Sequence, residues 1–276
     1  MLKVTGLTKK FENFTLENVG FTLPAGYIMG FIGMNGAGKT TTIKSNMRMI
    51  RPDAGRVEIF GLDMAEHELE IKQSIGFAAG AFEYYRQKPL KKITDVYRRF
   101  FRDWDETAYR DCLKRFSLDE TQRVSQLSAG MRVKYGLALG LSHNARLFIF
   151  DEPTSGLDPV ARDDLLDLFL SLIEDGSRSI LFSTHITSDL DKCADYVTFI
   201  KNGRIVMSDA KDAIIDAHTV VSGGSEMLAS LQDKLIGVKS HDFGFKALMK
   251  TADVPESLRA TAVRPDLEDI TVYYNR

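Results

Sequence analysis

Residues that cross-link small folds or hold structural metals are scarce in this sequence. Its 276 residues include only two cysteines, Cys112 and Cys193, which belong to no redox or metal-binding motif. We interpret both as reduced thiols in the cytosol, because structural disulfides belong to oxidising compartments. The five histidines show no ligand spacing, so we expect no structural metal site.

The sequence also lacks long apolar runs and an excess of positive charge. No run approaches the ~18 residues of a membrane-spanning helix, and residues 1–5 start no apolar signal-peptide segment. A net charge of −2 does not suit a basic nucleic-acid-binding domain. The length fits a soluble chain with one large domain, alone or with a small appendage.

A glycine-rich stretch that begins at Gly33 organises the chain. Through Thr40 it reads G-x-x-x-x-G-K-[ST], the pattern of a phosphate-binding loop. Backbone N–H groups can surround a polyphosphate only where side chains do not block them, and glycine permits the close approach and the backbone geometry. We therefore expect the loop to bind nucleotide through Asn35, Gly36, Ala37, Gly38, Lys39, Thr40 and Thr41.

The residues on either side supply the context that this loop requires. Residues 27–32 are an apolar run of the length of a buried strand, and residues 41–50 predict a helix. The helix N-terminus then faces the phosphates with free N–H groups. Lys39 supplies a point charge for the β- and γ-phosphates, and the Thr40 hydroxyl is placed to bind Mg²⁺. A chance glycine-rich turn, the alternative, would lack this context.

Two more apolar strands are followed by residues that can act on phosphates. Residues 147–150 lead to Asp151 and Glu152, and residues 180–182 lead to His185. Ligands of parallel sheets bind at the carboxyl ends of strands, so we expect these side chains to lie near the loop. Asp151 fits a second Mg²⁺ residue, and Glu152 can orient or deprotonate the attacking water. The alternatives are a solvated acidic turn and a structural histidine.

The remaining chain divides by composition. Residues 1–26 predict a β-rich start, and residues from about 82 to 142 predict a helical subdomain inserted into an α/β core. We expect Ser128 to cap a helix near residues 131–141, and the pair Asn202-Gly203 to close a hairpin. Within the insert, an apolar stripe at helical spacing favours core packing over a docking face. The stripe consists of Ile93, Val96, Tyr97, Phe100 and Phe101.

These motifs together resemble those of the ATP-binding cassette (ABC) ATPases. Residues 127–131 resemble the signature motif of that family, and residues 151–158 resemble its second nucleotide motif and D-loop. His185 matches the switch histidine, and Phe11 matches the aromatic residue that stacks on adenine. The resemblance covers about residues 1–210 in the correct order, and it is greatest to ATPase subunits of bacterial exporters, whose membrane subunits are separate chains.

The resemblance implies an α/β P-loop NTPase core of ABC type, with a β-rich N-terminal part and the inserted helical subdomain. Residues 1–210 would form the nucleotide-binding domain, and residues 211–276 a small α+β accessory domain. The chain would bind and hydrolyse ATP, with Mg²⁺, on the cytoplasmic face of the cell membrane. Its partners would be integral membrane permease subunits, and no nucleic acid.

The resemblance also implies a head-to-tail dimer, formed with an identical chain or with another ABC ATPase. Each ATP would lie between the phosphate loop of one subunit and Ser128 and Gly130 of the other. Glu152 would act as the general base, His185 would sense the γ-phosphate, and Asp151 would support the Mg²⁺. ATP binding would close the dimer and hydrolysis would reopen it.

The sequence departs from the family pattern at two places. Ala129 and Met131 stand where the signature has glycine and often glutamine, and methionine removes a polar contact. Gly80 stands where the family has a glutamine that reaches the Mg²⁺ and the attacking water; Glu83 and Gln87 are the nearest polar residues. We expect the site to work without a substitute ligand and the isolated chain to hydrolyse ATP slowly.

Two other functions remain open from the sequence. A soluble ABC ATPase of DNA repair or translation would share this core, but such proteins carry long coiled-coil arms or two cassettes, which are not visible here. A regulatory cassette that hydrolyses ATP poorly would be consistent with Gly80. A turnover assay on the assembled complex separates the latter from an active ATPase.

Overall fold

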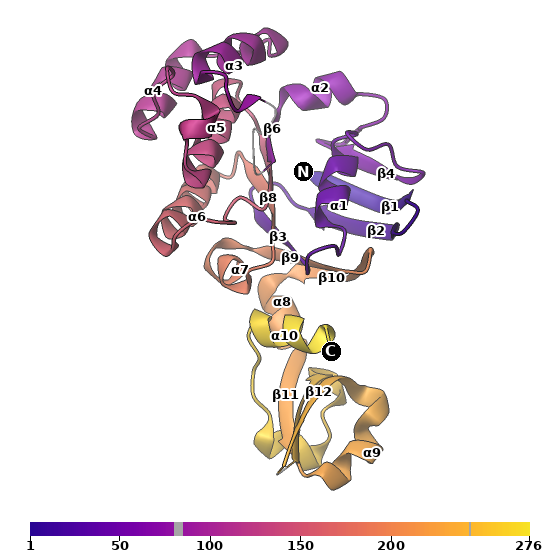
Figure 1. The fold of residues 1–276 in the computed structure, drawn as a ribbon. Coiled ribbons are helices and arrows are strands. Elements are labelled where there is room, and N and C mark those ends of the chain that lie inside the picture. Colours follow the sequence, from indigo (N-terminus) through magenta and orange to yellow (C-terminus); the bar gives the residue numbers. More distant parts are fainter. Residues whose placement is uncertain (80–84, 243) are drawn as a thin grey trace.

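The structure is a computed structural model that describes residues 1–79, 85–242 and 244–276. A mixed six-stranded sheet, in the order β10-β9-β3-β8-β7-β6, forms its centre (Figure 1). Five of the strands run parallel, and β10 joins the edge in the antiparallel direction. The strands are β3 (Ile28–Ile32), β6 (Ile75–Ala79), β7 (Leu147–Asp151), β8 (Ser179–Thr184), β9 (Tyr196–Lys201) and β10 (Arg204–Ala210).

The apolar strands are buried on both faces because each face has its own cover. On β7, Phe148 and Phe150 belong to the core shared with α5 and α6, whereas Leu147 and Ile149 belong to the core shared with the N-terminal sheet. That second, antiparallel sheet has the order β2-β1-β4-β5. Its strands are β1 (Leu2–Lys10), β2 (Thr15–Leu23), β4 (Ala54–Ile59) and β5 (Leu62–Asp63).

The expected α/β core with a β-rich start is thus confirmed, with small differences at helix ends. Helix α1 covers Lys39–Asn46 and is shorter than the predicted 41–50, because Arg48 adopts a left-handed backbone with a φ of 52°. Asp158 caps α6 (Pro159–Ile173) by accepting hydrogen bonds from the N–H groups of Val160 and Ala161. The short helices α2 (Glu68–Gln73) and α7 (Thr187–Cys193) complete this part.

The inserted helices are α3 (Leu90–Tyr97), α4 (Glu106–Arg115) and α5 (Ala129–Ser142). Ser128 caps α5 as predicted, since its hydroxyl accepts from the N–H of Met131 at 3.2 Å. The expectation of core packing for the apolar stripe is only partly right. Tyr97 and Phe101 stack on each other, but Val96 and Phe100 are 55% and 69% exposed. The reason is that nothing among the described residues covers that side of α3.

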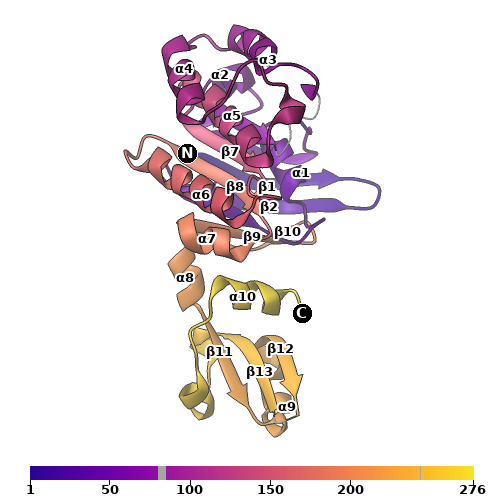
Figure 2. The same cartoon turned by 60° about the vertical axis from the view of Figure 1, so that its left-hand side comes forward.

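The chain leaves the main body after the hairpin of β9 and β10. Asn202 and Gly203 close it with φ values of 49° and 77°, as the sequence predicts. Helix α8 (Lys211–Asp216) leads to a three-stranded sheet in the order β11-β13-β12, which hangs below the main body in Figure 2. The elements are β11 (His218–Gly223), α9 (Leu228–Leu231), β12 (Leu235–His241), β13 (Gly244–Lys250) and α10 (Leu267–Tyr274).

Helix α10 returns to the main body. The Lys201 ammonium donates to the backbone oxygen of Tyr274 at 2.6 Å, and the Tyr274 ring meets Phe199 edge-on at 6.0 Å. Along residues 1–79, 85–242 and 244–276, helices of the length and apolarity needed to cross a membrane are absent.

Candidate active site

A cavity of about 650 Å³ lies at the carboxyl ends of β3, β7 and β8. Three strands that are far apart in the sequence end here, as the topology of a parallel sheet dictates. The cavity therefore collects the predicted phosphate loop and the residues that follow the other two strands. Its lining includes Asn35, Gly36, Gly38, Lys39, Thr40, Thr41, Glu152 and His185, with Asn13, Phe14, Met34 and Ser155.

The phosphate loop has the backbone geometry that its glycines were expected to supply. Gly36 and Gly38 have φ values of 79° and 112°, and Gly38 directly precedes α1. An added Cβ on Gly38 would also meet the Phe14 ring at 3.0 Å. The first N–H groups of α1 therefore point into the cavity without a side chain in front of them, which is the arrangement of an anion-binding helix terminus.

Lys39 is held in place by the loop itself. Its side chain is only 6% exposed, and its ammonium donates to the backbone oxygen of Gly33 at 2.7 Å. It also donates to the backbone oxygen of Met34 at 3.4 Å, and its charged partner is Glu152, whose Oε1 lies 3.0 Å from the Lys39 nitrogen. A buried cation is costly without a counter-charge, and Glu152 supplies that negative charge.

Glu152 is held from its other side by His185. The His185 Nδ1 lies 2.8 Å from Glu152 Oε2, so one carboxylate joins the phosphate loop to the end of β8. Glu152 itself has a φ of 53°, a left-handed conformation that costs a side-chain-bearing residue about 1–2 kcal/mol. Such strain persists where the surroundings fix the residue, and it is common at active sites.

Asp151 faces the start of α1 from the end of β7. Its Oδ2 accepts a hydrogen bond from the Thr40 hydroxyl at 2.8 Å, and its Oδ1 accepts one from Ser183 at 2.7 Å. The Ser183 hydroxyl also accepts from the Glu152 N–H at 2.9 Å. A carboxylate and a hydroxyl side by side are hard oxygen donors, which fit Mg²⁺.

Sequence reasoning missed Ser183, which is fully buried and holds both acidic residues. It also missed a cluster around Asp189, a fully buried carboxylate on α7. Asp189 accepts from the hydroxyls of Thr154 at 2.7 Å and Thr184 at 2.9 Å, and it forms an ion pair with Arg162. The cluster ties the loop after Glu152 to the residue before His185. The sequence signal that could have indicated this cluster was the position of Asp189, four residues after His185 at the end of a predicted strand.

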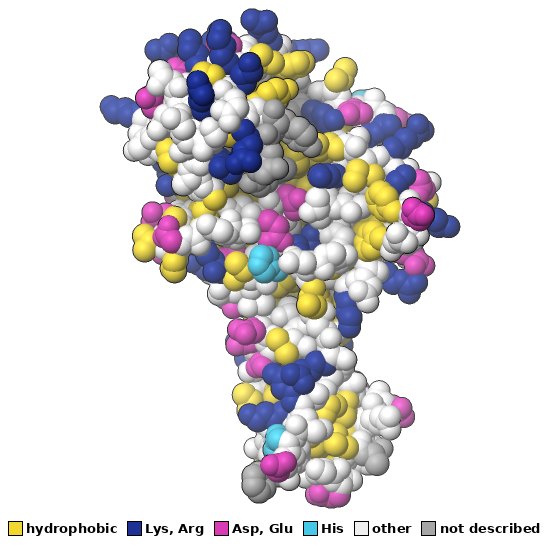
Figure 3. Space-filling view, in the orientation of Figure 1, with side chains coloured by type: hydrophobic (Ala, Val, Ile, Leu, Met, Phe, Trp, Pro, Cys, Tyr) yellow, Lys and Arg dark blue, Asp and Glu magenta, His cyan; other side chains and the backbone are white. Residues whose placement is uncertain are grey.

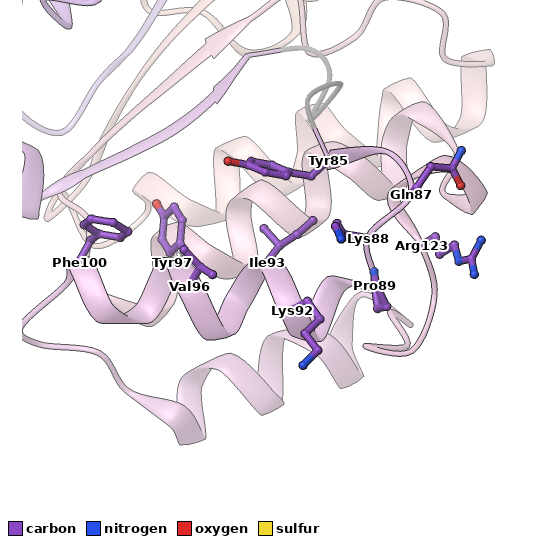
Figure 4. Close-up of a pocket in the computed structure, with 10 residues that line it drawn as sticks. All are labelled: Tyr85, Gln87, Lys88, Pro89, Lys92, Ile93, Val96, Tyr97, Phe100 and Arg123. Atoms are coloured by element: carbon purple, nitrogen blue, oxygen red, sulfur yellow. The ribbon is translucent and has the colours of Figure 1, made fainter.

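Five predicted residues do not line the cavity in this single chain, and one of them, Asp151, contacts its lining through the hydrogen bond from Thr40. Phe11 is 43% exposed and lies beside Phe14, with 6.4 Å between the ring centroids. Ser128 and Gly130 lie at the start of α5, outside the lining, and Ala37, within the phosphate loop, is buried. Gly80 and Glu83, where the sequence departs from the family pattern, lie outside the described residues, and Gln87 lines a different cavity, beside α3 (Figure 4).

The chain is similar to known proteins in sequence and in fold. The family model described as ABC transporter matches residues 16–155. The bacitracin transport ATP-binding protein BcrA of Bacillus licheniformis is 32% identical over 209 residues, which are 75% of this chain and 68% of BcrA. The Nod factor export ATP-binding protein I of Burkholderia lata is 28% identical over 262 residues, 91% of this chain and 86% of that protein.

Among solved structures, the fold is similar to the dimeric ATP-binding cassette MJ0796, bound to ADP and Pi in a post-hydrolysis state. The TM-score is 0.67 at 20% identity, over 76% of this chain and 98% of that one. At this identity the likeness concerns the fold.

Proposed function

The chain belongs to the ABC transporter family of ATPases, and from that premise we propose that it energises a bacterial exporter. ATP binding and hydrolysis are the family's chemistry. The export direction is favoured by the relatives, one of which is named for Nod factor export. We place the nucleotide-binding domain at residues 1–210, and an accessory domain at 211–276.

One observation carries the assignment of roles: Glu152 is shared between Lys39 and His185. We propose that phosphate groups of ATP replace Glu152 at Lys39, because both are anions that compete for one buried ammonium. The released carboxylate can then accept a proton from the attacking water. His185, already beside Glu152, is placed to hold the γ-phosphate and to orient the base.

The Mg²⁺ proposal rests on the Thr40–Asp151 pair. These two residues would hold the ion, with Ser183 fixing the orientation of the Asp151 carboxylate. When bound, the ion would neutralise charge on the phosphates. Phe11 would stack on adenine after a small movement toward the cavity, which Phe14 and Asn13 already line.

We further propose a head-to-tail dimer. Ser128 and Gly130 lie outside the cavity of their own chain, so they can serve nucleotide only from a second subunit. The Ser128 hydroxyl accepts from the Met131 N–H, and the other N–H groups at the start of α5 would face the γ-phosphate. The second subunit would be an identical chain or another ABC ATPase, and membrane permease subunits would hold the pair on the cytoplasmic face of the membrane.

The test is Glu152→Gln. The amide keeps the shape and can still accept from His185, but it cannot take a proton, so we expect ATP binding to persist while turnover falls at least about 100-fold. A closed dimer should accumulate with ATP and Mg²⁺ on size-exclusion chromatography. Glu226→Gln makes the same chemical change at an exposed site on the accessory domain and should be neutral. Wild-type turnover by Glu152→Gln would exclude Glu152 as the base.

A DNA-repair or translation ATPase is not favoured, because the relatives reported above are named for transport. The alternative of a cassette that hydrolyses ATP poorly rests on Gly80. Turnover of the wild-type chain, measured with its membrane subunits, tests that alternative.

A further inference from the structure

A second cavity lies between the accessory domain and the phosphate loop. It has a volume of about 290 Å³, and its walls come from residues 32–35, His185, Phe199, Thr271 and Asn275. Thr271 lies on α10 and Asn275 directly after it, and this helix sits between the accessory sheet and the main body (Figure 1, Figure 2). Because Met34, Asn35 and His185 also line the nucleotide cavity, the accessory domain forms a wall immediately beside the active site.

His185 has a partner on only one side. Its Nδ1 lies beside Glu152, and its other ring nitrogen has no hydrogen-bond partner among the residues that the structure describes. The side chain is 43% exposed and borders the same cavity as α10. The space into which the imidazole can turn is therefore bounded by α10.

Tyr274 holds α10 in this position. Its backbone oxygen accepts from the Lys201 ammonium and its ring meets Phe199 edge-on, so both contacts are to β9 of the main body. On its other side, the Tyr274 hydroxyl lies 3.0 Å from Nε2 of His218, on β11 of the accessory sheet. One residue of α10 thus joins that sheet to β9, which pairs with β3, the strand that leads into the phosphate loop.

The hydrogen bonds of His218 fix the tautomer of its neutral ring. Its Nδ1 lies 2.7 Å from the backbone oxygen of Ile214, which can only accept, so Nδ1 carries the proton. Nε2 then has a free lone pair, which accepts from the Lys250 ammonium at 2.9 Å and from the Tyr274 hydroxyl. A proton on Nε2 would remove this acceptor and put two positive charges 2.9 Å apart.

The surroundings of His218 oppose that second proton. Burial and the Lys250 ammonium both lower the pKa of His218. The titratable groups that face it are Lys250 of β13 and Tyr274 of α10, while the carboxylate of Asp216, on α8, is paired with Arg264 at 2.9 Å. Figure 3 shows further Lys and Arg side chains gathered on the accessory domain just below the main body. His218 is therefore neutral at neutral pH and takes up the proton as the pH falls below 6.5.

We propose that Tyr274 is a positioning residue for His185, and that its hydrogen bond to neutral His218 makes ATP turnover sensitive to acidification. The inference rests on the roles proposed above for Glu152 and His185 and adds a means of regulation. When Nε2 is protonated, the Tyr274 hydroxyl loses its acceptor, and the end of α10 leaves the cavity. His185 then gains room to turn away from Glu152. Turnover falls, whereas ATP affinity changes little, because Lys39 does not line this cavity.

The first test compares turnover and ATP affinity of full-chain variants between pH 5 and pH 8. Tyr274→Phe removes the hydroxyl and keeps the ring against Phe199. We expect it to lower kcat about fivefold at pH 7.5 and not at pH 5, where the wild type has already lost the contact. Glu152 and His185 are present in both proteins, so the ratio of the two rates isolates the effect of His218. Tyr273→Phe, whose hydroxyl has no hydrogen-bond partner among the described residues, is the control.

The second test moves the pH at which turnover is lost. Lys250→Met removes the positive charge and the hydrogen bond that keep Nε2 unprotonated. The loss of turnover on acidification should then begin about one pH unit higher than in the wild type. Lys246→Met, on the same strand, is the control and should leave the pH dependence unchanged.

The third test follows α10 itself. Both native cysteines are buried, so Thr271→Cys places a thiol in the cavity that maleimide can report. Its labelling rate, divided by that of Val263→Cys at an exposed position of the accessory domain, should rise as the pH falls below 6.5. The division removes the intrinsic effect of pH on thiol reactivity.

The outcomes separate this inference from the proposed function. If the wild-type chain hydrolyses no ATP with or without membrane subunits, the proposed function fails and the inference fails with it. If it hydrolyses ATP but the ratio of wild-type kcat to that of Tyr274→Phe is the same at pH 5 and pH 7.5, only the inference is overturned. A relative labelling rate at position 271 that does not change with pH overturns it too. So does a loss of ATP affinity in Tyr274→Phe as large as the loss of kcat, because Tyr274 would then support the whole phosphate loop.

Discussion

Asp189 offers the sharpest test of how the active-site loops are held. Its carboxylate is fully buried and accepts from Thr154, Thr184 and Arg162, which come from three separate segments. Asp189→Ala removes all three interactions at once. Two hydroxyls lose their acceptor, and Arg162, whose side chain is 24% exposed, loses its counter-charge.

The expected loss of stability follows from this burial. Breaking a buried ion pair by removing one partner costs about 3–5 kcal/mol, because the remaining charge is left unpaired. Arg162 keeps some access to water, which lowers that cost, while the two buried hydroxyls add to it. We expect Asp189→Ala to lower the free energy of unfolding by about 4 kcal/mol. Asp189→Asn retains an acceptor for the hydroxyls and should lose about half as much.

Urea unfolding monitored by circular dichroism measures this quantity. Asp191→Ala, an exposed carboxylate on the same helix, is the control and should stay within about 0.5 kcal/mol of the wild type. Turnover supplies the functional measurement. Because Thr154 and Thr184 flank Glu152 and His185, we expect Asp189→Asn to lower kcat about tenfold while ATP binding, which depends on Lys39, changes little.

Two results would refute this reasoning. An unfolding free energy of Asp189→Ala within about 1 kcal/mol of the wild type would mean that the cluster does not hold the loops together. An Asp189→Asn variant that loses ATP affinity in proportion to turnover would mean that the cluster supports the whole nucleotide cavity and not the two catalytic loops.

Two further predictions concern Lys39 and His143. Lys39→Ala should abolish ATP binding or turnover without unfolding the protein, because Lys39 contacts loop oxygens and Glu152 and not the apolar core. Equilibrium dialysis measures the ATP affinity, and Lys44→Ala is the control. His143 is buried against Phe101, and this burial lowers its pKa to about 4. The contribution of neutral His143 to the free energy of unfolding is fully present above pH 6.5. About 3 kcal/mol of it is lost as the pH falls toward 4. In His143→Phe the free energy of unfolding should depend less on pH between 4 and 6.5 than it does in the wild type. His67→Gln, a change at an exposed histidine, should leave that pH dependence unchanged.

The local elements of this protein could be predicted from the sequence because their causes are local. Gly36 and Gly38 permit the backbone of the phosphate loop, Ser128 caps α5, and Asn202-Gly203 closes a hairpin. Each depends on the backbone preferences of a few consecutive residues. Asp151, Glu152 and His185 come at or just after the ends of predicted strands. We therefore expected them to lie together, because parallel strands end at one edge of a sheet.

The tertiary structure decided which of these residues contact each other. Lys39 and Glu152, 113 positions apart, form an ion pair, and Thr154 donates a hydrogen bond to Asp189 across 35 positions. Helical spacing likewise showed that Val96 and Phe100 share a face with Tyr97, but not that this face is left open. Periodicity specifies the direction of a side chain on its own helix. What lies opposite depends on how distant segments pack, and no short stretch of sequence contains that information.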